Sequence, residues 1–104
     1  MTDIRRNVVI SGRVQGVGFR YWARGEADRL GVRGWVRNRA DGSVEAEIEG
    51  DPAAVSELLD ALGRGPSFAA VDDVTVTEVP VDGEPGFRVA ASERGGTSGW
   101  FRRG

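Results

Sequence analysis

A glycine-rich loop followed by an arginine is the part of this sequence best suited to chemistry. It runs from Val14 to Arg20, and its Gly16 and Gly18 tolerate positive φ angles, which let successive backbone N–H groups turn inward around an anion. A helix is predicted to begin at about Phe19 or Arg20, where free N–H groups and the helix dipole favour negative charge. Arg20 adds a planar guanidinium that can hold two phosphate oxygens. The loop therefore predicts a phosphate site; the alternative is a surface turn with a solvated arginine.

Asn38 is the second residue that suits this chemistry. It ends the predicted strand Val32–Asn38, which a helical crossover joins to the predicted strand Asn7–Ser11, so the two strands run parallel and end at one edge of the sheet. With one strand between them the ends are about 10 Å apart, a gap that a long loop can bridge. The neutral amide donates and accepts, so it can hold a water in line with a leaving oxygen. The alternative is a residue that hydrogen-bonds its own turn. We expect Arg37 and Arg39 on the opposite face, in solvent.

Composition limits the other possibilities. The chain has 104 residues, enough for one domain with a core, and a net charge of −2, which argues against a nucleic-acid or membrane-surface partner. It contains no Cys and no His, which removes disulfides, thiolate chemistry and the usual zinc sites. Catalysis must then use carboxylates, arginine, amides, hydroxyls or backbone groups. The apolar run Val8–Ile10 is far too short to span a bilayer, and we expect a cytoplasmic location.

Periodicity and turn signals predict the elements that position these residues. β-branched runs and alternation predict strands, stripes with a 3.6-residue period predict helices, and Asp51-Pro52 is typical of a helix start. In the third strand Val44, Ala46 and Ile48 should be buried, and the three glutamates between and after them should face water. The predicted strands are Asn7–Ser11, Val32–Asn38, Val44–Glu49, Val71–Val79 and a short Phe87–Val89; the helices end at Leu30 and at about Leu62.

The order βαββαβ predicts an α+β fold, a ferredoxin-like sandwich whose antiparallel sheet is covered on one face by two helices. We expect one domain over residues 1–90. Residues 91–104 carry no core pattern, so a flexible C-terminal tail is predicted there, with no role assigned to its Trp100 and Phe101.

Two segments resemble the signatures of the acylphosphatase family. The run Ile10–Arg20, ISGRVQGVGFR, is similar to its first motif, the loop G-R-V-Q-G-V-x-F-R. Gly34-Trp35-Val36-Arg37-Asn38, followed by Asp41-Gly42-Ser43-Val44 and closing at Gly50, is similar to its second. The resemblance covers about Val8 to Val89. Only the tail and Gly25, which interrupts the first helix at a cost of about 1 kcal/mol relative to Ala, depart from the pattern.

The resemblance implies an enzyme that hydrolyses small acyl phosphates to a carboxylate and inorganic phosphate, without a metal. We also expect a monomer that needs no cofactor and has no nucleic-acid or membrane partner. It also implies that Arg20 binds the phosphate and that Asn38 orients the attacking water. The expected phosphate-binding donors are the backbone N–H groups of Gln15, Gly16, Val17, Gly18, Phe19 and Arg20, together with the Arg20 guanidinium.

Three rival functions remain. A non-catalytic binding module of the same fold would need no Arg20–Asn38 pair. A nucleic-acid reader would carry aromatic residues on its third strand, where this chain has Glu45, Glu47 and Glu49. An acylphosphatase-like module of a larger carbamoyl-transfer maturation enzyme is the third, and the length and absence of zinc-binding motifs favour the stand-alone form.

Overall fold

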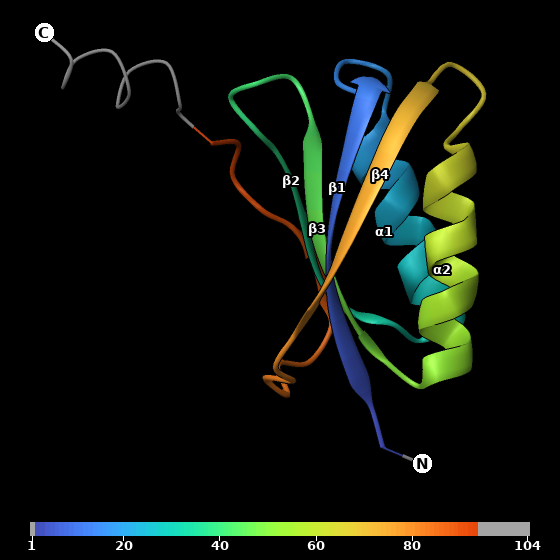
Figure 1. Cartoon of the computed structure of the whole chain (residues 1–104), viewed down its shortest axis with the longest axis vertical. Helices are drawn as coiled ribbons and strands as arrows, with labels where there is room; N and C mark the ends of the chain where they lie inside the picture. Colours follow the sequence, from blue (N-terminus) through green and yellow to red (C-terminus); the bar gives the residue numbers. More distant parts are fainter. Residues whose placement is uncertain (1, 94–104) are drawn as a thin grey trace, which may run out of the picture.

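A five-stranded sheet carries two helices on one of its faces (Figure 1). The computed structural model describes residues 2–93. In chain order the elements are β1 (Ile4–Arg13), α1 (Phe19–Leu30), β2 (Arg33–Asn38), β3 (Val44–Gly50), α2 (Pro52–Arg64), β4 (Ala70–Val79) and β5 (Phe87–Val89). Across the sheet the strands follow the order β4-β1-β3-β2-β5.

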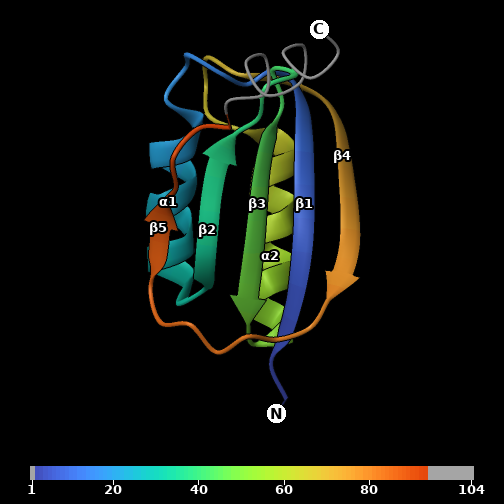
Figure 2. The same cartoon turned by 90° about the vertical axis from the view of Figure 1, so that its left-hand side faces the viewer.

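The strand pairing confirms the predicted ferredoxin-like α+β fold. β1 and β2 both pair antiparallel with β3, so they run parallel to each other, and β4 pairs antiparallel with β1. The edge strand β5 departs from the predicted antiparallel sheet, because it pairs parallel with β2. The connection after β4 crosses below the sheet in Figure 2 and therefore starts β5 beside the beginning of β2.

The core lies between the sheet and the helices. Val44 and Ala46 of β3 are buried opposite Ile10 and Val8 of β1, as the alternation predicts. Burial of each valine or isoleucine side chain stabilises the fold by about 1.5–3 kcal/mol relative to an exposed one. Within residues 2–93 neither helix is long and apolar enough to cross a membrane. The helices contribute Phe19, Ala23, Ala27, Val55, Leu58 and Leu62 to the core.

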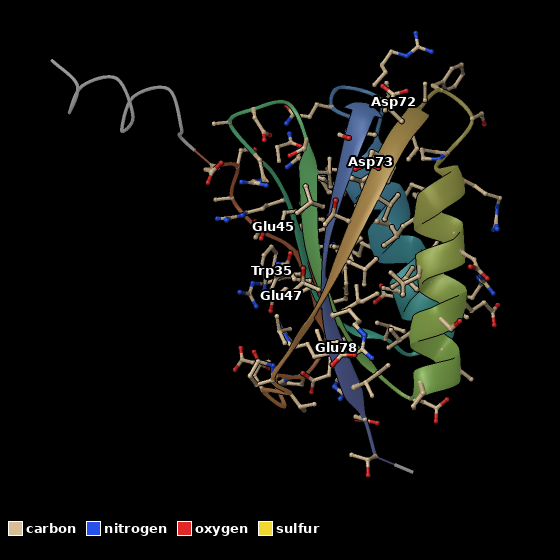
Figure 3. All side chains as sticks on the ribbon, in the orientation of Figure 1. Trp35, Glu45, Glu47, Asp72, Asp73 and Glu78 are labelled. Atoms are coloured by element: carbon tan, nitrogen blue, oxygen red, sulfur yellow. The ribbon has the colours of Figure 1, made fainter. Side chains whose placement is uncertain are left out.

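The other face of the sheet is not the wet surface predicted for β3. Glu45, Glu47 and Glu49 do point away from the helices, and Figure 3 labels the first two there. They do not face water, however: the side chain of Glu49 is 0% exposed, and those of Glu45 and Glu47 are only partly exposed. Arg5 of β1 donates to Glu47 at 2.7 Å, and Asn7 donates to both Glu45 and Glu47. The prediction was wrong on solvation because side chains of the neighbouring strands pair with these carboxylates.

Glu49 is the most enclosed of the three carboxylates. It accepts hydrogen bonds from Arg5 at 2.8 Å and Arg33 at 3.1 Å, and from the backbone N–H groups of Asp82 at 2.9 Å and Gly83 at 3.0 Å. Burial by itself raises the pKa of Glu49, but these donors outweigh it and bring the pKa down to about 2. The carboxylate therefore holds the loop between β4 and β5 against the sheet.

Hydrogen bonds to the sheet continue past residue 90, where we predicted the domain boundary. The N–H of Ala90 donates to the carbonyl of Val36 at 2.8 Å, and the N–H of Glu93 donates to the carbonyl of Asn38 at 2.9 Å. The chain is thus attached along β2 as far as Glu93. The remaining part of the predicted tail, with Trp100 and Phe101, lies outside the described residues.

Candidate active site

The glycine loop, defined here as residues 14–18, lies at the same end of the sheet as the end of β2. β1 ends at Arg13, the loop follows, and α1 begins at Phe19, while β2 ends at Asn38. In Figures 1 and 2 the loop and the turn after β2 both stand at the upper end of the molecule. This is the edge at which we expected the two parts of the site to meet.

Gly16 and Gly18 adopt the backbone conformation predicted for an anion-binding loop. Their φ angles are 75° and 79°, in the left-handed region that other residues enter only at a cost of about 1–2 kcal/mol. A Cβ atom built on either glycine would meet no atom within 4 Å. Conformation and not lack of space therefore requires glycine here, and the backbone over both residues is open to a ligand.

The N-terminus of α1 has no internal cap. Gly18 at the N-cap position has no side chain to accept a hydrogen bond, and the first turn contains no acidic residue. By contrast, Asp51 caps α2 and accepts from the N–H of Ala53 at 3.1 Å. The first N–H groups of a helix lack intrahelical acceptors, and the helix dipole adds a partial positive charge. The loop thus leads into an end of α1 that suits an anion.

Side chains on both sides of the loop hold it in place. Val14 and Phe19 are buried in the core, and Val17 packs against it. The side-chain Nε2 of Gln15 donates to the carbonyl oxygens of Arg39 and Ser43, both at 2.8 Å. The side-chain NH₂ of Gln15 therefore bonds the turn after β2 and is not itself one of the predicted phosphate donors.

Asn38 lies on the helix-facing side of the sheet, at the last position of β2. It pairs with the buried Val44, and Val36, two residues before it, is also buried. Its Oδ1 is buried and has no hydrogen-bond partner among the described residues. An unpaired buried acceptor is costly, by about 1–3 kcal/mol, unless water or a ligand satisfies it. The amide oxygen of Asn38 is therefore an acceptor that the described part of the protein leaves unsatisfied.

Arg20 lies in the first turn of α1, partly exposed. Its guanidinium carbon is 5.8 Å from the centre of the Tyr21 ring, and within residues 2–93 it forms no ion pair with a carboxylate. The guanidinium is thus not neutralised by a described residue. An anion bound at the N-terminus of α1 would find this charge beside it.

The flanking arginines differ from the prediction of two solvated side chains. Arg37 is 35% exposed, donates to Glu45 at 2.8 and 3.0 Å, and lies over the ring of Trp35. Arg39 is 34% exposed, and its Nε is buried without a hydrogen-bond partner in the described part of the chain. Both lie within 4.0 Å of the Glu93 carboxylate. Sequence reasoning missed Glu93, which no periodicity or turn signal marks.

Together these groups suit an anion with several oxygens, such as a phosphoryl group. The loop supplies N–H donors, α1 supplies its positive end, and Arg20 supplies a guanidinium. In residues 2–93 no group of three or more His, Cys, Asp and Glu side chains is arranged to hold a metal ion.

Comparison with known proteins places the chain among proteins of one family. The acylphosphatase family model matches residues 6–89, a span that contains the loop, Arg20 and Asn38. An acylphosphatase of Acidiphilium cryptum is 54% identical over 84 residues, which cover 81% of this chain and 92% of that protein. An acylphosphatase of Nitrobacter winogradskyi is 58% identical over 74 residues, which cover 71% of this chain and 75% of that protein.

Solved structures also include acylphosphatases that resemble this chain. The acylphosphatase from Bacillus subtilis superposes with a TM-score of 0.82 and 40% identity, covering 84% of this chain and 98% of that one. A segment of full-length HypF superposes with a TM-score of 0.83 and 28% identity, but covers only 13% of that chain. With the family model matched over residues 6–89 and relatives above 50% identity, this chain belongs to the acylphosphatase family.

Proposed function

We propose that this chain hydrolyses acyl phosphates by in-line attack of a water that Asn38 positions on a phosphoryl group held by the loop and Arg20. Membership of the acylphosphatase family makes the chain an enzyme and implies hydrolysis of small acyl phosphates. The observation that carries the residue assignment is the common edge: an uncapped helix N-terminus with a left-handed glycine loop lies at the same end of the sheet as Asn38.

In this proposal the loop binds and orients the phosphoryl oxygens. The N–H groups of Gln15, Gly16, Val17, Gly18, Phe19 and Arg20 and the Arg20 guanidinium are the donors. Phosphoryl transfer depends mainly on positioning and on stabilising charge on the three equatorial oxygens. Donors that are fixed before the reaction begins stabilise the transition state without a cost of reorganisation. The structural support is that Val14, Gln15 and Phe19 hold the loop on both sides.

Asn38 holds the attacking water through its unpaired Oδ1. The water oxygen forms a bond to phosphorus as the bond from phosphorus to the carboxyl oxygen breaks, and the electron pair of that bond leaves with the carboxylate. A carboxylate is a good leaving group, so no strong acid is required. The water proton passes to a phosphoryl oxygen of the substrate, since we assign no side chain as general base.

In this mechanism the reaction needs no metal or cofactor, because the chain has neither His nor Cys and residues 14–20 contain no carboxylate that could hold Mg²⁺ beside the phosphate. Hydrolysis of a simple aromatic acyl phosphate should therefore proceed unchanged in EDTA. Loss of activity in EDTA that Mg²⁺ restores would contradict this part of the proposal.

A monomer in the cytoplasm remains a prediction, which light scattering and cell fractionation test.

Substitution of Asn38 is the experiment that tests the mechanism. Asn38→Ala should lower kcat by about 10²–10³, by comparison with the loss of an oxyanion donor, and leave competitive inhibition by inorganic phosphate nearly unchanged. A group that contacts only the water contributes mainly in the transition state. The matched control is Asn7→Ala, since Asn7 is bonded to Glu45 and Glu47 on the opposite face and should not affect turnover.

Two results would reject the assignment. If phosphate inhibition weakens as much as turnover falls, Asn38 is a binding residue and does not position water. If the wild-type chain binds phosphate but hydrolyses no acyl phosphate, the chain is a binding module.

A further inference from the structure

Glu93 lies beyond the segment that the family model matches, and it contacts the residues on both sides of Asn38. Its backbone N–H donates to the carbonyl of Asn38 at 2.9 Å. One carboxylate oxygen accepts from the N–H of Ala40, also at 2.9 Å. The carboxylate also lies 4.0 Å from nitrogens of Arg37 and Arg39. A single residue therefore contacts the backbone at Asn38 and at Ala40.

These contacts close the free edge of β2 where the candidate site begins. β5 ends at Val89, and the chain after it continues beside β2 through the bonds from Ala90 to Val36 and from Glu93 to Asn38. On its other side Asn38 is paired with Val44 of β3. The backbone of a strand sets the direction of each Cα–Cβ bond, so holding Asn38 on both edges fixes the face and the place from which its side chain extends.

The carboxylate of Glu93 also stabilises the residues that follow Asn38. Among the described residues Glu93 is the carboxylate that pairs with Arg39, and the Nε of Arg39 is buried without a hydrogen bond. The carbonyl of Arg39 is also an acceptor for Gln15. Removing the carboxylate would leave the Arg39 charge without this counter-ion and the Ala40 N–H without its acceptor. Both groups lie next to the Arg39 carbonyl that Gln15 contacts.

We propose that Glu93 is a positioning residue that holds Asn38 in its working orientation through its contacts with Asn38, Ala40 and Arg39. The inference rests on the proposed role of Asn38. It assigns no contact between Glu93 and the substrate, so Glu93 should influence turnover through Asn38 alone.

Three variants of the full chain test this. Glu93→Ala should lower kcat by about tenfold, as small misplacements of a catalytic group do, while inhibition by inorganic phosphate changes little. Glu93→Gln should keep more activity, because its amide oxygen can still accept from Ala40. Glu78→Ala is the matched control: it removes the same charge from an 84% exposed side chain of β4, which Figure 3 shows toward the lower end of the strand.

A double-mutant cycle separates positioning from general destabilisation. In an Asn38→Ala background, Glu93→Ala should cause no further loss of kcat. Additive losses, or a loss of phosphate affinity equal to the loss of kcat, would overturn the proposal. The proposal would also be overturned if Glu93→Ala kept the wild-type kcat while Asn38→Ala lost it. That result would not contradict the proposed function.

A spectroscopic measurement does not depend on turnover. The chain has three side-chain amides, those of Asn7, Gln15 and Asn38, so their NH₂ signals in a ¹⁵N spectrum can be assigned by substitution. Glu93→Ala should shift the Asn38 pair and leave the Asn7 pair in place. An unmoved Asn38 signal would overturn the positioning role, whereas a wild-type chain without acyl phosphate hydrolysis would reject the proposed function.

Discussion

The side-chain amide of Gln15 donates to the carbonyl oxygen of Arg39 over 2.8 Å and so ties the glycine loop to the residue after Asn38. A second bond of 2.8 Å from the same nitrogen reaches the carbonyl of Ser43, across the turn. The N–H of Arg39 also donates to that Ser43 carbonyl. One side chain thus couples the proposed phosphate-binding loop to the strand end that carries the proposed water-positioning residue.

Gln15→Met should loosen this coupling, because methionine has a similar length and no donor. Each carbonyl keeps one backbone donor, so the free energy of unfolding should fall by only about 1 kcal/mol. The KM for an acyl phosphate and the inhibition constant for phosphate should both rise. Steady-state kinetics and denaturant titration measure these effects, and kinetic constants equal to those of the wild type would show that the bridge does not organise the loop.

Arg20→Ala should weaken phosphate inhibition and kcat/KM together, by roughly ten- to hundredfold, because the guanidinium makes charge-assisted bonds in both ground and transition states. Arg20→Lys should not restore full function, since a point charge cannot hold two oxygens at once. Arg24→Lys is the control, on an exposed position of the same helix that pairs with Asp28. Wild-type kinetics in Arg20→Lys would refute the bidentate contact.

Gly18→Ala and Gly25→Ala should have opposite effects on stability. Gly18 has a φ of 79°, so alanine there should lower the free energy of unfolding by about 1–2 kcal/mol and disturb phosphate inhibition. Gly25 lies inside α1, and a Cβ added there would meet no atom within 4 Å, so alanine should raise stability by about 1 kcal/mol. Denaturant titrations of both variants decide this. A stable, fully active Gly18→Ala would show that the loop does not need its left-handed glycine.

Acid should destabilise the fold through Glu49. Its folded-state pKa of about 2 lies below the ordinary value of 4.5, so its stabilisation is complete above about pH 5 and is lost as the pH falls toward 2. The difference corresponds to roughly 3 kcal/mol. Glu49→Gln should therefore be less stable than the wild type at pH 7, and the gap should narrow toward pH 2. The exposed Glu78→Gln is the control, and a gap that does not depend on pH would contradict this origin.

Local features of the fold and site could be predicted from the sequence. Gly16 and Gly18 adopt the predicted positive φ angles because only glycine enters this region without a steric cost. Asp51 and Pro52 begin α2 as predicted, because a carboxylate can accept from the free N–H groups of the first turn. The crossover through α1 also predicted that β1 and β2 end together. The glycine conformations and the helix start depend on residues a few positions apart, the range over which pattern and propensity carry information, and the common end of β1 and β2 follows from a general rule for helical crossovers.

Only the tertiary structure decided which polar groups meet. The alternation of β3 predicts that Glu49 leaves the core, but its burial depends on Arg5, 44 residues away, and on a loop that returns after β4. Gln15 finds its acceptors 24 and 28 residues along the chain, and Glu93 accepts from an N–H 53 residues before it. Such pairs form because the strand order places β1 and β2 on either side of β3 and brings the chain after β5 alongside β2. Their partners are set by the register between strands, which the period of a single segment does not encode.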